Sequence, residues 1–433
     1  MENERAEAVQ RTTRLHLGME AVETLRQIEE FPDNPLSMDY FYSFFRKLFT
    51  GDSLLPDNKQ LIGTMCVQVP DELIYATGAV PVRLCSGVSA YDQIGAEFMP
   101  AKSCPVVRAT SGMLHVNREL WKDKLAAVII PTTCDQKKKV AEQIDGSFYN
   151  VYSLEMPSSK ESDAARFYWQ ESVKQFALDL EKITGKKITG KNVQKAIAKK
   201  SEAAQIYRKL QALRISDSPV IFGKDMLLVT NGFFMDDIDN WIEAASVLLA
   251  ELEDRTSQKI TVTNKNAPRL LLTGSPPIFP NIKVPIMIEQ SGAVIVSDEV
   301  CSSSRILYDV VSYDEANLSD MIPAIADKYL KPCTCPCLSP NTDRQRKLLE
   351  MAKDFKADGV VYQAFSGCLP YEMEQMQISR VLEEAGIPML YVETDYSAED
   401  HGQLSTRIEA FIESIKMKKR KRKGRQTRVI GKT

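Results

Sequence analysis

Short apolar runs alternate with amphipathic segments along the chain from about residue 56 onward. The runs are rich in β-branched residues, as in AAVIIP (126–131), AVIVSDE (293–299) and DGVVYQAF (358–365). Strands that are buried on both faces of a parallel sheet show this continuously apolar pattern. The segments between them, such as EQMQISRVLEEAG (374–386), have helical periodicity. Alternating strands and helices predict an α/β protein with two doubly wound, Rossmann-like lobes and parallel sheets.

Two further stretches show helical patterns only. Residues 1–55 combine helical periodicity with an aromatic stripe between Tyr40 and Phe49, which we expect to pack in the core or against another subunit rather than to bind a cofactor. Residues 158–262 hold long helical patterns and no cysteine. The predicted organisation is an N-terminal helical region (1–55), a first α/β lobe (56–157), a helical bridge (158–262), a second α/β lobe (263–415) and a basic disordered tail (416–433).

Composition and charge narrow the class of protein. The 433 residues are 44% hydrophobic and 26% charged, which excludes wholesale disorder and a membrane bundle. No window reaches the roughly 18 uninterrupted apolar residues of a spanning helix, and the N-terminus is too polar for a secretory signal. We therefore expect a soluble, cytoplasmic protein without membrane contact.

The net charge of −3 hides a strong asymmetry between the body and its C-terminal end. Residues 416–433 hold ten Lys or Arg and no acid, so the body carries 45 − 58 = −13. Such a run is usually a solvated extension. The run also has no aromatic residue on which a base could stack, which argues against a nucleic-acid partner.

Cysteine is the residue type that points to chemistry. A reducing compartment keeps thiols unpaired, so a cysteine-rich cytoplasmic chain suggests metal or redox chemistry more than disulfides. Only three histidines are present, which weakens a zinc or mononuclear iron site and leaves thiolate as the main ligand. The nine cysteines are Cys66, Cys85, Cys104, Cys134, Cys301, Cys333, Cys335, Cys337 and Cys368.

The cysteines fall into two sets with similar spacing. In the first lobe Cys66, Cys104 and Cys134 are 38 and 30 positions apart. In the second lobe Cys301, one cysteine of PCTCPC (332–337) and Cys368 are each separated by about thirty-odd positions. Cys134, Cys301 and Cys368 directly follow predicted strands, at the sheet edge where open α/β folds bind ligands. Helices that begin after such cysteines direct their N-terminal dipoles at a thiolate.

Three thiolates per lobe would leave one metal coordination position open to substrate, water or a bridge to a second cluster. This arrangement favours catalysis over simple electron storage. We interpret Cys85 as a buried packing residue. The element PCTCPC allows a third interpretation, zinc or copper binding by close thiols, although the second CxxC pair of a zinc ribbon is missing.

At these residues the sequence resembles the 2-hydroxyacyl-CoA dehydratase (component D) superfamily, over nearly all of the chain from about 60 to 415. Within that superfamily the six-cysteine pattern is most similar to the double-cubane cluster proteins. The matching segments are MCVQVPDELIYATGAVPVRL (65–84), SCPVVRATSG (103–112), IIPTTCDQKKK (129–139), SGAVIVSDEVCSSSR (291–305), ADGVVYQAFSGC (357–368) and IPMLYVETDYSAEDHGQLSTRIEAF (387–411).

The resemblance implies an iron-sulfur cofactor, either a double-cubane [8Fe-9S] cluster or a single [4Fe-4S] cluster. Cys66, Cys104 and Cys134 would bind one set of irons. Cys301, Cys368 and either Cys333 or Cys335 would bind the other. The family shows two cysteines before a Pro-Asn pair, whereas three precede Pro340-Asn341 here, so the choice between Cys333 and Cys335, and the role of Cys337, stay open.

The resemblance also implies an oxygen-sensitive, anaerobic reductase, usually a homodimer. A separate ATP-hydrolysing [4Fe-4S] activator would charge its cluster, which then passes low-potential electrons to a small-molecule substrate. The absence of a GxxxxGK[ST] motif agrees with an ATPase on another protein. The alternatives are a 2-hydroxyacyl-CoA dehydratase subunit with one [4Fe-4S] cluster that works through a ketyl radical, and a non-catalytic cluster carrier or nucleic-acid-associated sensor.

Residues close to the proposed ligands in sequence are candidates for supporting roles, and an ordinary salt bridge is as good an interpretation for each. Glu72 in PDELIYA is expected to cap its helix rather than bind substrate. The supporting candidates are Arg108, His115, Asp135, Glu299, Arg305, Tyr362 and Gln363.

Overall fold

The computed structural model describes residues 2–51, 59–146 and 149–430. Parts of the predicted 1–55 region, of the first lobe and of the tail (Met1, 52–58, 147–148 and 431–433) therefore lie outside the described residues. Two four-stranded parallel sheets form the centres of two lobes. Their strands are β1 (Leu61–Thr64), β2 (Val80–Arg83), β3 (Leu125–Pro131), β4 (Val151–Leu154), β5 (Arg269–Gly274), β6 (Val294–Glu299), β7 (Gly359–Phe365) and β8 (Met389–Thr394).

The two sheets have the same topology. Their strand orders are β2-β1-β3-β4 and β6-β5-β7-β8, so in each lobe the first and third strands pair at the centre. Every pairing is parallel, with register such as Thr64 opposite Arg83 and Thr273 opposite Tyr362. From the central pair, the chain continues to one edge of the sheet after the first strand and to the other edge after the third. Such a reversal of strand order leaves a crevice beyond the carboxyl ends of the central strands. The predicted two-lobed α/β class is confirmed.

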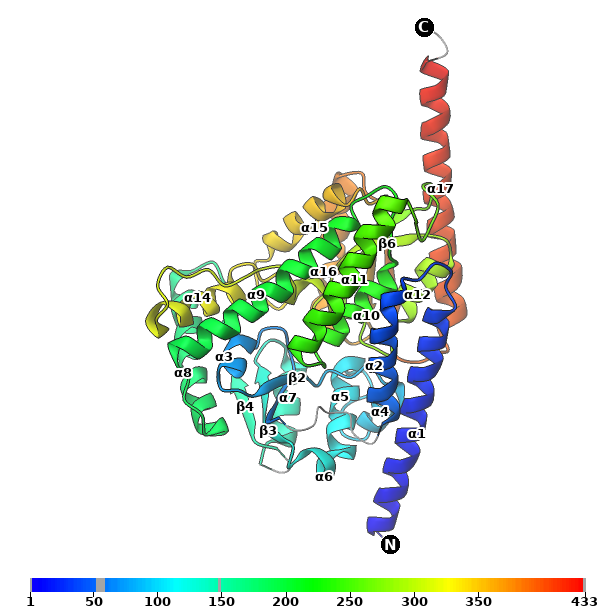
Figure 1. The fold of residues 1–433 in the computed structure, drawn as a ribbon. Helices are drawn as coiled ribbons and strands as arrows, with labels where there is room; N and C mark the ends of the chain where they lie inside the picture. Colours follow the sequence, from blue (N-terminus) through cyan, green and yellow to red (C-terminus); the bar gives the residue numbers. More distant parts are fainter. Residues whose placement is uncertain (1, 52–58, 147–148, 431–433) are drawn as a thin grey trace.

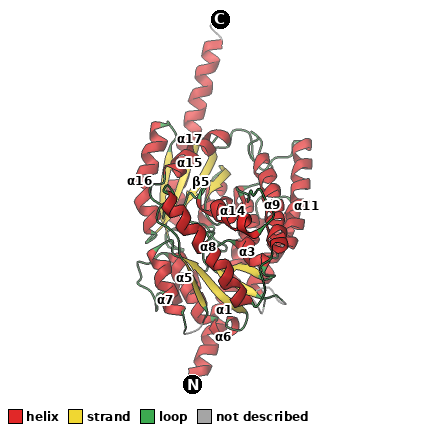
Figure 2. Ribbon diagram, turned by 90° about the vertical axis from the view of Figure 1, so that its left-hand side faces the viewer, coloured by secondary structure: helices red, strands yellow, loops and turns green. Residues whose placement is uncertain are grey.

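Helices cover the sheets of both lobes (Figures 1 and 2). Because the central strands β5 and β7 are covered on both sides, every residue in them is buried, which explains their continuous apolar pattern. The first lobe contains α3 (Asp71–Ala76), α4 (Ser89–Gly95), α5 (Pro105–Val116), α6 (Arg118–Trp121) and α7 (Asp135–Ile144). The second contains α12 (Lys283–Gln290), α13 (Ser304–Leu307), α14 (Leu318–Leu330), α15 (Thr342–Asp354) and α16 (Leu369–Glu384).

A helical segment connects the lobes, as predicted. It consists of α8 (Asp163–Thr184), α9 (Gly190–Leu213), α10 (Gly223–Phe233) and α11 (Ile238–Gln258). The side chain of Ser162 caps α8 by accepting the Ala165 N–H over 3.1 Å, and Gly185 ends that helix at φ 67°. The long helices α9 and α11 pack against each other across the front of the molecule in Figure 1.

The N-terminal region is helical as well, with α1 (Glu2–Glu29), a short 3-10 turn (Leu36–Met38) and α2 (Asp39–Thr50). The predicted aromatic stripe lies on α2. Phe45 and Phe49 are buried against Phe279 of the second lobe. The ring centroid of Phe279 lies 4.6 Å from that of Phe45 and 5.2 Å from that of Phe49. These buried members of the stripe therefore pack between the N-terminal region and the second lobe, whereas Tyr40 is 39% exposed.

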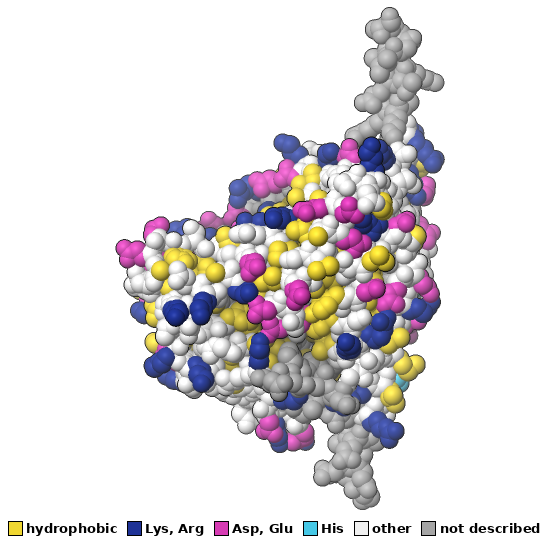
Figure 3. Space-filling model, in the orientation of Figure 1, with side chains coloured by type: hydrophobic (Ala, Val, Ile, Leu, Met, Phe, Trp, Pro, Cys, Tyr) yellow, Lys and Arg dark blue, Asp and Glu magenta, His cyan; other side chains and the backbone are white. Residues whose placement is uncertain are grey.

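The C-terminal end differs from the expected disordered tail. Helix α17 runs from His401 to Ile430 and extends beyond the body of the molecule (Figure 1). Lys and Arg are good helix formers and the run contains no proline, so the helix that packs against the second lobe continues into the basic segment. On the face shown in Figure 3, basic and acidic side chains of the body are interspersed. None of the described helices combines the length and apolar composition needed to cross a bilayer.

Candidate functional site

A cavity of about 410 Å³ has walls from both lobes and from the end of α10. Eight of the nine cysteines line it, and we call it the thiol cavity. Four of these cysteines come from each lobe. They are Cys66, Cys85, Cys104 and Cys134 from the first lobe and Cys301, Cys335, Cys337 and Cys368 from the second.

Strand ends and helix starts position these thiols. Cys134 and Cys368 each lie three residues after the third strand of their lobe and are the N-cap residues of α7 and α16. Cys85 and Cys301 each lie two residues after the second strand of their lobe. The carboxyl ends of the strands therefore direct thiols from both sheets into one crevice, as the sequence pattern predicts for Cys134, Cys301 and Cys368.

The two sets meet across the boundary between the lobes. The thiols of Cys104 and Cys368 share a hydrogen bond, which together with burial raises the pKa of Cys368 well above its usual value. Gln136 joins the same two segments, because its Oε1 accepts the Cys104 N–H at 2.8 Å and its Nε2 donates to the Gly367 carbonyl at 2.9 Å. The side chain of Gln136 therefore holds two cysteine-bearing segments, one from each lobe, in a fixed relation.

The three cysteines of PCTCPC have different surroundings. Cys335 and Cys337 line the thiol cavity, and the Cys337 thiol donates to the Cys335 sulfur at 3.2 Å, which lowers the pKa of Cys335 to about 6. Cys333 instead lines a neighbouring pocket and accepts a hydrogen bond from Gln68 Nε2 at 2.8 Å. Burial raises the pKa of Cys333 to about 12. Geometry thus groups Cys335, and not Cys333, with the other thiols.

Cations accompany the thiols: Lys137 and Arg83 line the cavity. Burial would lower the pKa of Arg305, but this side chain lies close enough for the charges of Cys335, Cys301 and Cys333 to raise it. Lys137 lines the cavity, where burial would lower its pKa, but the charge of four surrounding thiolates raises that pKa well above the usual value. Burial raises the pKa of Cys301 to about 12 and also raises that of Cys134. The four thiols around the ammonium group belong to Cys66, Cys85, Cys134 and Cys301.

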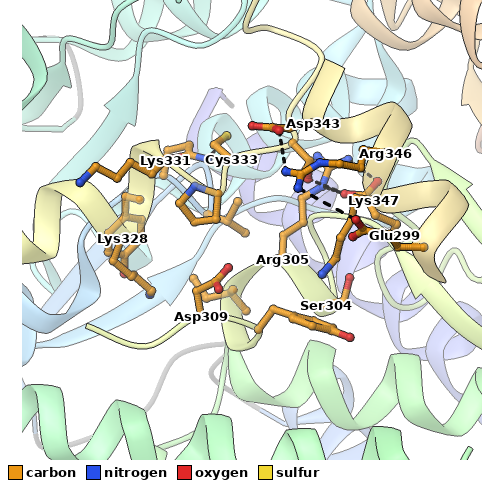
Figure 4. Close-up of a pocket in the computed structure, with 18 residues that line it drawn as sticks. Glu299, Ser304, Arg305, Asp309, Lys328, Lys331, Cys333, Asp343, Arg346 and Lys347 are labelled. Atoms are coloured by element: carbon orange, nitrogen blue, oxygen red, sulfur yellow. Dashed lines mark hydrogen bonds and ion pairs between the residues drawn. The ribbon is translucent and has the colours of Figure 1, made fainter. Parts of the chain in front are cut away.

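Figure 4 shows the neighbouring pocket, whose volume is about 230 Å³. Val67 and Gln68 line both this pocket and the thiol cavity. Two of the supporting candidates, Glu299 and Arg305, lie in the wall of the neighbouring pocket. Glu299 accepts hydrogen bonds at 2.6 Å from Arg305 Nε and from Thr334 Oγ1, and it also pairs with Arg344. Thr334 lies between Cys333 and Cys335, so this buried carboxylate fixes the loop that carries them.

The remaining supporting candidates lie away from the thiols or face solvent. Arg108 forms an ion pair with Asp92, and His115 stacks on Phe98 at 3.8 Å. Asp135 lies at the cavity rim but is exposed and paired with Lys138 at 3.2 Å. Two more candidates, Tyr362 and Gln363, are buried in β7 and bond to neighbouring segments of the second lobe.

Glu72 has another role than the expected capping, since the N-cap residue of α3 is Pro70 and no side-chain capping hydrogen bond is found there. It lies in the first turn of α3, where its carboxylate accepts the Tyr329 hydroxyl at 2.7 Å and the Lys328 ammonium at 3.3 Å. Burial would raise the pKa of Glu72, but the charges of Lys328 and Lys200 lower it. Glu72 is therefore a buried partner of α14 in the second lobe.

Sequence reasoning misses three residues at the cavity. The interpretation of Cys85 as packing is incomplete, because it lines the cavity at the same distance from its strand as Cys301. Gln136 and Lys137 follow Cys134 directly in the first turn of α7. A partial signal is present for Gln136 and Lys137, because the turn that begins after a strand-end cysteine borders the same crevice as that cysteine, whereas the sequence does not mark the strand end before Cys85.

The donor set suits a cofactor with several metal atoms better than one ion. Among the described residues, no three His, Cys, Asp or Glu side chains converge closely enough to hold a single metal ion. In an iron-sulfur cubane each thiolate binds a different iron, so the sulfurs of its ligands are spread over the cluster. Eight thiols around one cavity can hold such a group.

Comparison with known proteins identifies the family. The family of the 2-hydroxyglutaryl-CoA dehydratase D-component matches residues 66–415, so the chain belongs to this family. A protein of Escherichia coli named "Putative dehydratase subunit YjiM" is 31% identical over 82% of this chain and 91% of its own length.

Two further relatives have more specific names. The (R)-phenyllactyl-CoA dehydratase beta subunit of Clostridium sporogenes is 26% identical over 82% of this chain and 92% of its own length. One subunit of the benzoyl-CoA reductase of Thauera aromatica is 22% identical over 83% of this chain and 92% of its own length. The family thus includes subunits of dehydratases and of a reductase, and the relatives are components of enzymes with more than one subunit.

Proposed function

We propose that the chain is an iron-sulfur reductase that carries a double-cubane [8Fe-9S] cluster in the thiol cavity. A separate ATP-hydrolysing [4Fe-4S] activator protein charges the cluster, which passes low-potential electrons to a small-molecule substrate. The observation that carries the proposal is the gathering of eight thiols from two topologically matched lobes around one cavity. A single cluster with an open iron would use only three of them.

The residues present fit this cofactor. Cys66, Cys104 and Cys134 would hold one cubane, and Cys301, Cys335 and Cys368 the other. Cys335 is preferred to Cys333 because its thiol lines the cavity. When bound, the cluster supplies electrons at low potential.

The protein itself provides the surroundings. Helices α5, α7 and α16 begin at Cys104, Cys134 and Cys368, so the positive ends of their dipoles would offset part of the negative charge of a bound cluster. Apolar walls that include Phe234, Met235 and Ile278 limit the access of water. Exclusion of water and hydrogen bonding to sulfur both tune the potential of such a centre.

The relatives favour one second function, that of a 2-hydroxyacyl-CoA dehydratase subunit with one [4Fe-4S] cluster, because a relative is named as a beta subunit of such an enzyme. That subunit would need a non-identical partner chain. The reductase would instead be a homodimer that needs only its activator.

Metal analysis distinguishes the two functions. Protein purified without oxygen is assayed for iron and acid-labile sulfide and examined by EPR spectroscopy. We expect about eight irons and nine sulfides per chain, whereas about four of each would exclude the double cubane. Mass photometry of the same sample gives the oligomeric state. A chain that turns over only with a second, different subunit would support the dehydratase.

The ligand assignment is tested by single substitutions. We expect Cys134→Ala and Cys368→Ala each to lower the iron content and to abolish turnover, because each removes a thiolate at a helix start. The pair Cys335→Ala and Cys333→Ala is the sharpest comparison, since only the first thiol lines the cavity. Full iron content in Cys335→Ala, or its loss in Cys333→Ala, would contradict the assignment.

A further inference from the structure

Three consecutive lysines of α7 do not all face the same way. Lys138 and Lys139 are exposed and pair with acids of the same helix, Asp135 at 3.2 Å and Glu142 at 2.9 Å. Lys137 lines the thiol cavity instead. The helix therefore directs one of its three ammonium groups inward and leaves the other two in solvent.

The inward position offers Lys137 no carboxylate. Among the described residues that line the thiol cavity the acidic one is Asp135, and Asp135 is exposed and paired with Lys138. No ion pair between Lys137 and an acid is found in the described part of the chain. Lys137 is half-buried, and withdrawing a cation from water without a counter-charge is unfavourable, so negative charge from another source would stabilise it here.

Sulfur can supply that negative charge. Lys137 lines the same cavity as Cys66, Cys85 and Cys134 of the first lobe and Cys301 of the second. The charges of all four thiolates act on its ammonium group. Thiolates that bind iron are deprotonated and release their protons to solvent, so the loaded cavity accumulates negative charge around this position.

We infer that Lys137 is a charge-balancing residue of the thiol cavity: its ammonium group offsets part of the negative charge of the thiolate-bound centre and thereby raises the midpoint potential and slows the loss of iron. The inference rests on the proposed function. Lys137 acts on the centre through its charge, so it is a positioning residue and carries no proton or electron itself. Adding an electron increases the negative charge beside the ammonium group, which stabilises the reduced state most.

The test compares Lys137→Gln with Lys137→Arg, and with Lys138→Gln and Lys139→Gln as matched controls one and two positions along the same helix. Each protein is loaded with iron and sulfide without oxygen. The midpoint potential is then measured by redox titration followed by EPR, and the rate of iron release is measured with an excess of a chelator.

We expect Lys137→Gln to have a more negative midpoint potential and to release iron about tenfold faster or more, because a nearby charge in a buried site is weakly screened. Lys137→Arg keeps the charge and is expected to remain close to the wild-type protein, as are both controls. If Lys137→Gln does not load at all, loading of Lys137→Arg still supports the role of the charge.

Three results would overturn the inference. They are an unchanged potential and release rate in Lys137→Gln, equal effects in the Lys138→Gln control, or failure of both Lys137 variants to load although circular dichroism shows them folded. These results are separable from failure of the proposed function, in which the wild-type protein itself would bind no iron and sulfide.

Discussion

At the scale of single residues, Gly367 shows how closely the lobes approach at the cavity. It precedes Cys368 directly and has φ +83°. A Cβ at this position would lie 2.1 Å from the carbonyl oxygen of Lys102 in the first lobe. The carbonyl of Gly367 also accepts the Gln136 hydrogen bond. Only glycine satisfies the backbone conformation and the contact together.

We therefore predict that Gly367→Ala lowers the free energy of unfolding by about 2–4 kcal/mol, from left-handed strain plus a clash with backbone. Iron loading should fall as well, because the segment that carries Cys368 must move. Gly386→Ala is the matched control, since Gly386 has φ +72° but open space around its Cβ. It should cost only about 1–2 kcal/mol and leave loading intact. Urea unfolding and iron analysis measure both, and equal effects of the two changes would contradict the role of the lobe contact.

Single residues also show how far the sequence determines the site. Cys134, Cys301 and Cys368 are recognisable because each follows an obvious apolar strand. Cys85 is not, because β2 has only four residues, Val80–Arg83, and the run continues through Leu84 without a visible end. The direction in which the Lys137 side chain points also cannot be predicted from the sequence. Three adjacent lysines are equivalent in a pattern, and only the helix phase separates the inward one.

At the scale of elements, the strands are the most predictable part. The runs 126–131, 293–299 and 358–365 correspond to β3 (Leu125–Pro131), β6 (Val294–Glu299) and β7 (Gly359–Phe365), because burial on both faces leaves an unmistakable pattern. The basic segment is expected to be disordered since charge runs rarely pack. The structure continues α17 through it, because the helix propensity of Lys and Arg and the absence of proline allow the preceding helix to continue.

Packing divides α17 into two parts. Ile415 is buried, and Lys419 Nζ contacts Asp358 at 2.6 Å next to β7. We predict that deletion of 420–433 changes the free energy of unfolding by less than about 0.5 kcal/mol and leaves iron content and turnover unchanged. Deletion of 416–433 removes the Lys419 ion pair and should cost about 1 kcal/mol, again without loss of iron.

Thermal unfolding and iron analysis of the two truncated proteins test this division. Loss of iron or turnover in the protein that lacks only 420–433 would show that the basic helix takes part in the function, and would favour a carrier or sensor whose tail contacts an anionic partner.

At the scale of the whole molecule, the two lobes share one topology but differ in their thiols. Cys85 matches Cys301 and Cys134 matches Cys368 in distance from the strand end. Cys66, after β1, has no cysteine counterpart after β5, where Pro276 lines the cavity instead. The spacing in the sequence suggests that Cys66 and Cys301 are equivalent. Strand order, which the spacing does not contain, shows that they are not.

Helix α1 links the two lobes through polar contacts. Both carboxylate oxygens of Glu20 lie 3.1 Å from the Ser89 N–H of the first lobe, and Thr24 Oγ1 donates to the Pro280 carbonyl of the second at 3.3 Å. Burial raises the pKa of Glu20 from 4.5 to about 7. The neighbouring Tyr396 stays neutral in this range, because burial raises its pKa well above the usual value.

The raised pKa of Glu20 makes stability depend on pH. Between pH 4.5 and about 7 the folded chain retains a proton on Glu20 that the unfolded chain has lost, so stability falls as the pH rises through this window. Glu20→Gln keeps an oxygen acceptor for Ser89 but has no charge to bury. We predict that its free energy of unfolding matches that of the wild-type protein near pH 4.5 and exceeds it by about 2 kcal/mol at pH 8, after allowance for partial exposure.

Urea unfolding of the unloaded protein at both pH values measures the difference. Glu97→Gln, at an exposed position after α4, should shift neither value. A constant difference between Glu20→Gln and wild type across the window would show that Glu20 is already ionised in the folded chain, and that α1 is held to the first lobe by a charged rather than a neutral carboxyl group.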